Sequence, residues 1–275
     1  MFSNSKVQLK SLLLTFKANY SAKLGPMQKI VMLCGAPGVG KGMFSRFLAD
    51  DFGYVKVSTG DEIRKILNGY EYPNVSSGTV KTLKDYVNSG RLVPDNLIME
   101  ILYQKIKEPG SSRGVILDGF PRTVNQLKMF NEVFPIHLVV NIEERYDYIM
   151  ASLLGRRTCM DCGMSYSAYS YYKDGYELDV QMPAKKGVCD HCGGAVKTRE
   201  DDKEEIVKER LKEYKEKTFP LLKKLKEDGN LMSFEPKRGE RDYPKLQQLI
   251  VSQLGLPYYY YQTHIKDYNL SWYYN

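Results

Sequence analysis

The sequence predicts an α/β protein with a five-stranded parallel sheet flanked by helices and interrupted by a small inserted domain. Apolar runs without polar alternation, typical of parallel strands buried on both faces, occur at 29–34, 54–58, 114–118, 136–142 and 230–234. Helical patterns separate these runs at 41–51, 95–107, 123–133 and 143–155. This alternation indicates β-α-β units, whose ligands bind at the carboxyl ends of the strands. One segment, 158–198, is rich in Cys, Tyr and Gly and reads as the insertion.

Composition and charge restrict the classes of function. The 275 residues are 43% hydrophobic and 27% charged, as in an ordinary globular protein, and no apolar run is long enough to span a membrane. The net charge of +7 comes from residues 1–49, which hold seven Lys or Arg and no acid, while the rest is balanced. The body of the protein therefore gives no indication of a nucleic-acid-binding surface.

The two ends of the chain differ from its body. Residues 1–27 form a basic N-terminal extension in which Leu9, Leu12, Leu13 and Phe16 repeat at helical spacing. Such a leader resembles an organelle transit peptide, although a solvated or loosely docked helix is an equal alternative. We therefore expect an intracellular protein, in a mitochondrion or another organelle, or alternatively in the cytoplasm. The aromatic tail 256–275 is assigned no function.

A glycine-rich loop at 35–41 joins the first strand to the first helix. Its sequence, GAPGVGK, exposes consecutive backbone N–H groups to an anion at a helix N-terminus, and Lys41 reaches the β- and γ-phosphates. The motif usually ends in Ser or Thr, whose hydroxyl binds Mg²⁺, whereas Gly42 and Met43 follow here. Because all seven positions stand between a buried strand and a helix, the loop predicts nucleotide binding rather than a simple turn.

Six motifs, including this loop, carry a resemblance to a known family. The motifs are GAPGVGKG (35–42), STGDEIR (58–64), GRLVPD (90–95), LDGFPRT with Gln126 (117–126), GRR (155–157) and REDD with Arg210 (199–210). Their order and spacing resemble those of adenylate kinases over about residues 29–255. In that family Gly follows the loop lysine and the hydroxyl comes one residue later, so the departure is Met43.

The resemblance implies a P-loop kinase core with a small AMP-binding helical domain and an inserted zinc-binding lid. The expected domains are the core at 28–58, 89–155 and 201–255, the AMP-binding domain at 59–88 and the lid at 156–200. It also implies the activity, namely reversible transfer of the γ-phosphoryl of a Mg-nucleoside triphosphate, ATP or GTP, to AMP. The partners would be these nucleotides and ADP, with no nucleic acid and no membrane span, and the protein would be a monomer.

The residues that match the family's functional positions fall into three groups. The catalytic group is Lys41, Asp118, Arg122, Arg156, Arg199 and Arg210. The group for the triphosphate is Gly38, Val39, Gly40, Lys41, Gly42, Met43, Arg156, Ser165 and Tyr166. The group for AMP is Thr59, Arg64, Arg91, Leu92, Val93, Gly119, Arg122, Gln126, Arg199 and Arg210. Arginines suit this chemistry because a guanidinium matches two phosphate oxygens, and an amide such as that of Gln126 can read adenine.

The inserted segment holds Cys159-x-x-Cys162 and Cys189-x-x-Cys192, separated by 26 residues. Two such pairs predict a structural Zn²⁺ site of four thiolates, in addition to the Mg²⁺ bound with the nucleotide. Two disulfides and a nucleic-acid-binding zinc ribbon are the alternatives, and the modest charge of the insertion argues against the ribbon. The stretch YSYYKDGYELDVQ (169–181) makes the insertion longer than the family's lid.

Two alternatives to this function remain. The family has an arginine that packs on the donor base three residues before GRR, and Ser152 stands there instead. The donor can therefore be ATP or GTP, and a GTP:AMP phosphotransferase with little use of ATP is the first alternative. A weakly active nucleotide-binding module is the second, suggested by Met43 and Ser152, although Lys41 and the arginines argue against it.

Overall fold

The structure, a computed structural model, describes residues 29–72, 75–106 and 113–256. The predicted leader 1–27 and residues 257–275 of the tail lie outside these ranges, and so do the expectations attached to them. Within the described ranges, none of the helices has both the length and the apolar character needed to cross a membrane.

The five predicted strands form one parallel sheet. They are β1 (Lys29–Cys34), β2 (Val55–Ser58), β3 (Gly114–Asp118), β4 (Leu138–Ile142) and β8 (Met232–Phe234). Their order across the sheet is β2-β3-β1-β4-β8, and every neighbouring pair is parallel. The central position of β1 agrees with its composition, because Ile30–Leu33 have no exposed surface. The predicted five-stranded parallel sheet is confirmed.

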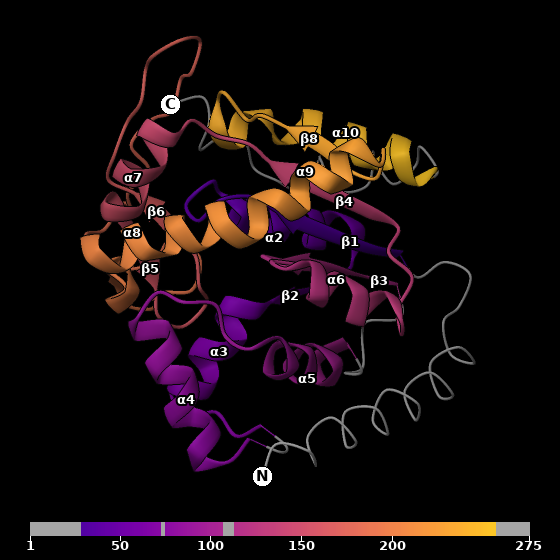
Figure 1. Cartoon of the computed structure of the whole chain (residues 1–275). Helices are drawn as coiled ribbons and strands as arrows, with labels where there is room; N and C mark the ends of the chain where they lie inside the picture. Colours follow the sequence, from indigo (N-terminus) through magenta and orange to yellow (C-terminus); the bar gives the residue numbers. More distant parts are fainter. Residues whose placement is uncertain (1–28, 73–74, 107–112, 257–275) are drawn as a thin grey trace.

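Successive side chains of the strands pack into two apolar cores, one on each face. Ile30 and Met32 belong to the core formed with α5 (Asp95–Ile106), α6 (Val124–Asn131) and α9 (Phe219–Glu227). Val31 and Leu33 belong to the core formed with α2 (Lys41–Phe52), α7 (Tyr146–Gly155), α8 (Glu204–Glu213) and α10 (Tyr243–Leu254). Helices α5 and α10 accordingly lie on opposite sides of the sheet (Figure 1). Covering both faces buries the strands and leaves their carboxyl ends as the accessible edge.

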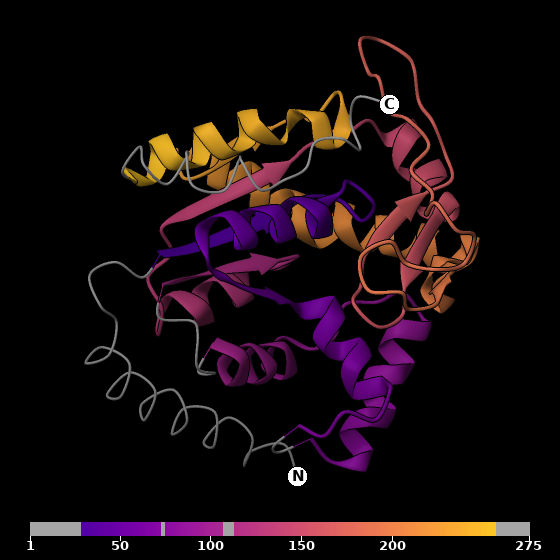
Figure 2. The same ribbon diagram turned by 180° about the vertical axis from the view of Figure 1, so that it is seen from behind.

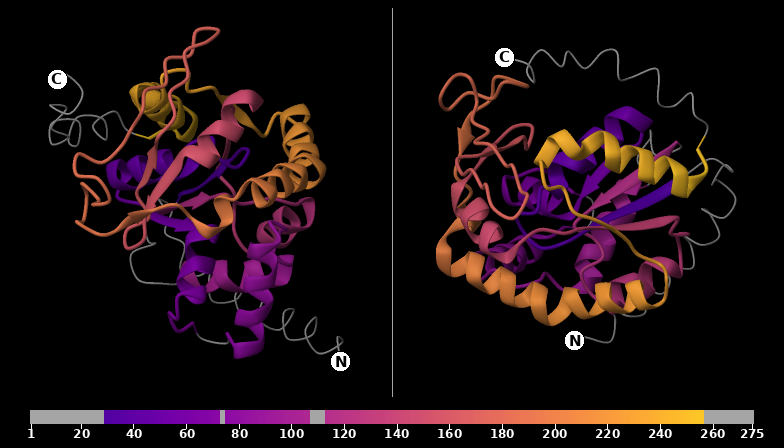
Figure 3. Two further views of the ribbon diagram at one scale, coloured as in Figure 1. Left: turned by 90° about the vertical axis from the view of Figure 1, so that its left-hand side faces the viewer. Right: turned by 90° about the horizontal axis from the view of Figure 1, so that it is seen from above.

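Two segments flank that edge. The helices α3 (Thr59–Leu67) and α4 (Ser77–Asn88) make up the segment predicted as the AMP-binding domain. The predicted lid holds a second, antiparallel sheet of β5 (Arg156–Cys159), β6 (Ser165–Ser167) and β7 (Val196–Lys197). The strands of the main sheet point toward this lid (Figure 2). Seen from that end, the lid and the α3–α4 pair surround the carboxyl ends of the strands (Figure 3, left).

Three short helical segments lie between the elements of the chain that follow the lid. The 3₁₀ turn η1 (Glu200–Asp202) precedes α8, a π-helical turn η2 (Tyr214–Thr218) joins α8 to α9, and η3 (Gly239–Asp242) precedes α10. Helices α8 and α9 run as one long rod along the molecule (Figure 3, right). The rod starts directly after the lid, so it brings residues that follow the lid back to the carboxyl edge.

Candidate active site

A cleft of about 610 Å³ lies at the carboxyl edge of the sheet, between the core and the lid. Residues that end or follow four of the strands line it: Gly35 after β1, Ser58 in β2, Asp118 in β3 and Glu144 after β4. All six residues predicted as catalytic and all nine predicted for the triphosphate line this cleft. The sequence-predicted set is therefore brought together in space, from segments as distant as β1 and α8.

The glycine-rich loop has the backbone that its sequence requires. Gly35 and Gly38 have φ of 135° and 90°, and a Cβ at these positions would lie 2.4 Å from the Ile142 carbonyl oxygen and 2.8 Å from Leu153 Cγ. Only glycine fits both positions. The loop leads into α2, whose first turn carries no acid and has no side-chain cap. Its N-terminal N–H groups and dipole thus favour an anion.

Lys41 lies folded onto the loop. Its ammonium donates hydrogen bonds to the carbonyls of Gly35 (2.9 Å) and Ala36 (2.6 Å). Burial lowers the pKa of Lys41 to about 7, while the neighbouring Asp118 acts in the opposite direction. An anion beside this ammonium would favour its charged form.

Asp118, at the end of β3, is the carboxylate next to the loop. The hydroxyl of Ser45, on α2, donates to Asp118 Oδ2 at 3.3 Å, but Ser45 has no exposed surface and does not line the cleft. Met43 lines the same cleft with an apolar side chain. A single carboxylate suits a hydrated Mg²⁺ held mainly by phosphate oxygens, rather than a cation in a protein cage.

The arginines form a dense cluster held by acidic residues. Arg156 Nε donates to Asp202 Oδ2 at 2.8 Å, and Arg210 Nη1 lies 3.1 Å from Asp201 Oδ2 and 3.2 Å from Asp202 Oδ1. Asp202 has only 4% of its surface exposed. A buried carboxylate that accepts from two guanidinium groups fixes both of them in position.

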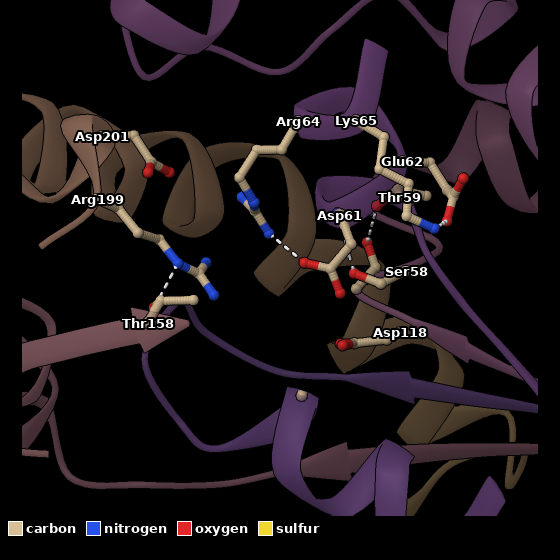
Figure 4. A network of polar contacts seen from close by, with 12 residues as sticks. Ser58, Thr59, Asp61, Glu62, Arg64, Lys65, Asp118, Thr158, Arg199 and Asp201 are labelled. Atoms are coloured by element: carbon tan, nitrogen blue, oxygen red, sulfur yellow. Dashed lines mark hydrogen bonds and ion pairs between the residues drawn. The ribbon is translucent and has the colours of Figure 1, made fainter. Parts of the chain in front are cut away.

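Two further arginines face each other across the cleft. Arg64 on α3 donates to Asp61 Oδ1 at 2.5 Å, and Arg199 after β7 donates from Nε to the Thr158 hydroxyl at 2.8 Å. Figure 4 shows their guanidinium groups directed toward the same space from opposite sides. They come from α3 and from the end of the segment predicted as the lid, so two separate segments supply this pair.

The electrostatics of the cluster favour an anionic ligand. Burial, followed by the charges of Arg156 and Arg64, holds the pKa of Arg199 well below its usual value. Burial likewise lowers the pKa of Arg122, and it lowers that of Arg210 to about 10. Crowded, desolvated cations destabilise one another unless an anion lies between them. The cleft therefore suits a ligand that carries several negative charges, such as a polyphosphate.

A smaller pocket of about 90 Å³ lies next to the cleft, under α3. It is lined by every residue predicted for AMP except Arg199, which lines only the larger cleft. Arg64, Arg122 and Arg210 line both cavities. Phosphates that enter from the two sides would therefore meet at the same three guanidinium groups.

Both the oxygen and the nitrogen of the Gln126 side-chain amide form hydrogen bonds within the protein. Its Oε1 accepts from the backbone N–H of Arg122 at 2.8 Å, and its Nε2 donates to Asp95 Oδ1 at 2.9 Å. The amide nitrogen carries a second hydrogen, and Gln126 lines the smaller pocket. The second N–H is the part of this side chain that suits a ligand.

The sequence analysis missed several residues of the cleft. Lys56 and Asp61 line it beside Asp118. Residues 178–181, in the tyrosine hairpin 169–181 of the lid, also line it, as do Pro236 and residues 238–241. A signal for Lys56 was available, because it lies near the carboxyl end of a predicted strand. The hairpin and the 236–241 segment have no motif, and only the folded chain brings them to the cleft.

The four cysteines of the lid form one group. Their sulfur atoms lie within 4.8 Å of one another, with Cys159 and Cys192 Sγ 3.5 Å apart and Cys162 and Cys189 Sγ 3.7 Å apart. All five cysteines lie in the described part of the chain, and none forms a disulfide. Four thiolates at about 2.3 Å from a tetrahedral Zn²⁺ would be separated by about 3.8 Å. The spacing therefore fits Zn²⁺.

Comparison with known proteins identifies relatives over most of the chain. The family model described as Adenylate kinase matches residues 33–230. The adenylate kinase of Caldicellulosiruptor saccharolyticus is 37% identical over 210 residues, which cover 74% of this chain and 89% of that protein. The adenylate kinase of Caldicellulosiruptor bescii is 38% identical over 209 residues, covering 74% and 89%. That of Syntrophotalea carbinolica is 33% identical over 232 residues, covering 82% and 98%.

Proposed function

Because this chain belongs to the adenylate kinase family, we propose that it transfers the γ-phosphoryl group of a magnesium–nucleoside triphosphate reversibly to AMP. Membership makes it a nucleoside monophosphate kinase; which nucleotides it uses and which residues hold them are inferred from the cleft. The observation that carries the proposal is the set of three arginines, Arg64, Arg122 and Arg210, that line both cavities. We also expect the protein to act as a monomer.

The proposed donor site is the glycine-rich loop with the lid residues above it. The N–H groups of 38–43 and the ammonium of Lys41 would hold the β- and γ-phosphates, and Ser165 and Tyr166 would cover them from the lid. Mg²⁺, bound with the nucleotide, would supply positive charge to the phosphate oxygens, with its waters ordered by Asp118. Arg122, Arg156, Arg199 and Arg210 would stabilise the charge of the transferred group in line between the two nucleotides.

The proposed acceptor site is the smaller pocket. Thr59, Arg64 and Gln126 would bind AMP together with Arg91, Leu92, Val93 and Gly119, all of which line this pocket. The segments 59–88 and 156–200 would move over the acceptor and the donor. Closure excludes water, which protects the transferred phosphoryl from hydrolysis.

The proposed lid cofactor is one Zn²⁺ ion bound by Cys159, Cys162, Cys189 and Cys192. Its function would be structural, because a closed set of four thiolates leaves no position for a substrate. The ion would hold the antiparallel strands that carry Arg156 and lead to Arg199.

A second candidate function, GTP:AMP phosphotransfer, is favoured by Ser152 and by the carboxyl groups that line the cleft. Ser152 donates its hydroxyl to the Gly38 carbonyl at 3.3 Å and presents no guanidinium to a base. Glu144, Asp179 and Glu240 line the same cleft. Carboxyl oxygens suit guanine, whose N1–H and 2-amino group are neighbouring donors that adenine lacks.

A coupled assay with AMP as acceptor and ATP, GTP or ITP as donor tests both functions. We expect turnover with AMP, and the ratio of kcat/KM for ATP and GTP decides the donor. ITP lacks the 2-amino group, so a preference of GTP over ITP would support reading of that group by a carboxylate. Absence of phosphoryl transfer to AMP from any of the three donors would overturn the proposed function.

A further inference from the structure

We infer that Lys56 is a positioning residue that balances Asp118 and makes triphosphate binding less dependent on the divalent cation, an inference that rests on the proposed function. Lys56 lies in β2, and its side chain is 19% exposed. Its Nζ is 3.8 Å from Asp118 Oδ2, 3.6 Å from Asp61 Oδ2 and 3.3 Å from the Gly42 carbonyl oxygen. The ammonium thus lies between the first turn of α2 and the carboxylate proposed to order the metal's waters.

The first step concerns the charge of Asp118. Its Oδ2 atom has both the Ser45 hydroxyl at 3.3 Å and the Lys56 ammonium at 3.8 Å beside it. A cation so close offsets the negative charge that attracts a divalent ion, because like charges repel at short range in a partly buried site. Asp118 is therefore a weaker partner for a hydrated Mg²⁺ than an unpaired carboxylate would be.

The second step concerns the triphosphate itself. The same ammonium lines the phosphate cleft, and it is packed against the helix start: a Cβ on Gly42 would lie 4.0 Å from Lys56 Nζ and 3.5 Å from Asp118 Oδ2. Lys56 is thus a fixed cation within reach of an anion at the N-terminus of α2. Phosphate oxygens would gain from Lys56 part of the attraction that a bound metal otherwise provides.

The third step concerns Met43, on the same turn of α2. Met43 lines the cleft and its apolar side chain packs against the core, so it offers no hydroxyl near the position where one usually binds the metal. Loss of that oxygen and neutralisation of Asp118 act in the same direction, since both weaken the metal's attachment to the protein. Lys56 compensates for the weaker metal by attracting the phosphate oxygens of the nucleotide directly. It does not strengthen the binding of the metal itself.

The experiment measures binding of a non-hydrolysable β,γ-imido analogue of the triphosphate by calorimetry, once with excess Mg²⁺ and once with EDTA. The readout is the ratio of the two dissociation constants, metal-free over magnesium-loaded. Lys56→Gln should weaken metal-free binding about tenfold, as expected for one lost charge-assisted contact, and magnesium-loaded binding less than threefold. The ratio therefore rises at least threefold. Lys56→Met, which keeps the apolar stem, should give the same result, and Lys56→Arg should restore the wild-type ratio.

Lys105→Gln is the matched control. Lys105 on α5 is also 19% exposed, and its Nζ lies 3.4 Å from Glu62 Oε2, outside both cavities. Its ratio should stay at the wild-type value. A merely structural Lys56 would lower both affinities by the same factor, so an unchanged ratio in Lys56→Gln and Lys56→Met overturns the inference. Transfer to AMP by the wild-type chain is assayed separately, so failure of the proposed function is seen there and not in this ratio.

Discussion

At the scale of single residues, the cleft holds its cations on internal partners that a nucleotide would replace. Lys41 donates to two carbonyls of its own loop, and Arg64 to Asp61. Motifs in the sequence predicted which cations gather in the cleft, because each motif lies next to the end of a strand or the start of a helix. The motifs could not predict which side chains form hydrogen bonds or ion pairs with the residues of the site. Asp95, which binds Gln126, and Lys56, which faces Asp118, are joined to them only by the fold.

The first prediction concerns the contribution of Lys41 to phosphoryl transfer. Lys41→Met should lower kcat about 10²–10³-fold, the scale expected for loss of one group that stabilises transition-state charge. Thermal stability should change little, since only two hydrogen bonds of the loop are lost. Lys208→Met, which removes an exposed cation from α8, is the control and should leave kcat unchanged. Near-normal turnover of Lys41→Met would show that the lysine is not part of the mechanism.

The second prediction concerns proton uptake at Lys41. Burial lowers its pKa to about 7 in the free protein, and the triphosphate should raise that pKa by stabilising the ammonium. Binding at pH 8 should therefore take up a proton, and the affinity should fall as the pH rises through about 7 and above. Calorimetry in buffers of different ionisation enthalpy measures the uptake. Lys41→Met should abolish it, and equal uptake in this variant would assign the proton to another group.

At the scale of elements, the lid is joined to the core by the tyrosine hairpin, residues 169–181. The hairpin has its own small core of Tyr171, Tyr176 and Leu178, packed against Tyr148 of α7. It is tied to the core by the N–H of Glu177, which donates to the Lys237 carbonyl at 2.8 Å. The sequence predicted the five strands of the main sheet and the helices α2, α5, α6 and α7 to within a few residues, because buried runs and helical periodicity are local. Docking of the hairpin depends on contacts between distant segments, and no local pattern encodes it.

The third prediction concerns this docking. Arg241 donates to the Glu177 carbonyl at 2.6 Å and lies 3.4 Å from Asp179 Oδ2, while its side chain is 41% exposed. Arg241→Ala should make residues 169–181 more sensitive to protease and raise the donor KM up to about fivefold, because exposed pairs contribute at most about 1 kcal/mol. Lys208→Ala, which removes an exposed pair within α8, should change neither. Equal protease sensitivity of Arg241→Ala and the wild type would show that the hairpin docks without this arginine.

The fourth prediction concerns the metal of the lid. The purified protein should hold about one Zn²⁺ per chain, and a strong chelator should expose 158–198 to protease and lower activity while the nucleotide core stays folded. The reason is that the two apolar cores do not include the cysteines of the lid. Cys192→Ser should lower the zinc content, and Cys34→Ser, which changes the buried thiol of β1, should leave it at one. Elemental analysis without metal, or mass spectrometry showing two disulfides, would refute the zinc site.

At the scale of the whole molecule, three parts of the chain meet at a single edge of the sheet. The core, the α3–α4 pair and the lid all contribute side chains to the same cleft. The sequence indicated this arrangement because parallel strands end at one edge, so residues after each strand must converge. Glu144, which follows β4, satisfies this rule, but no motif of the sequence singled it out. This carboxyl lines the cleft, and its Oε2 atom is buried without a hydrogen-bond partner among the described residues.

Glu144 should make the stability of the whole protein depend on pH. Burial raises its pKa to about 8, and the nearby charge of Glu235 adds to this, whereas an unfolded glutamate titrates near 4.5. Between these two values the folded protein binds the proton and the unfolded chain does not, so the free energy of unfolding falls as the pH rises from about 4.5 to about 8, and the contribution is constant above that. Glu144→Gln keeps the neutral shape and removes this titration. We therefore expect the melting temperatures of the wild type and of Glu144→Gln, measured from pH 5 to 9, to converge at the acid end. At the alkaline end the variant should have the higher melting temperature. The difference between the two curves isolates Glu144 from the other titrating groups, and parallel curves would mean that its carboxyl is already ionised at neutral pH.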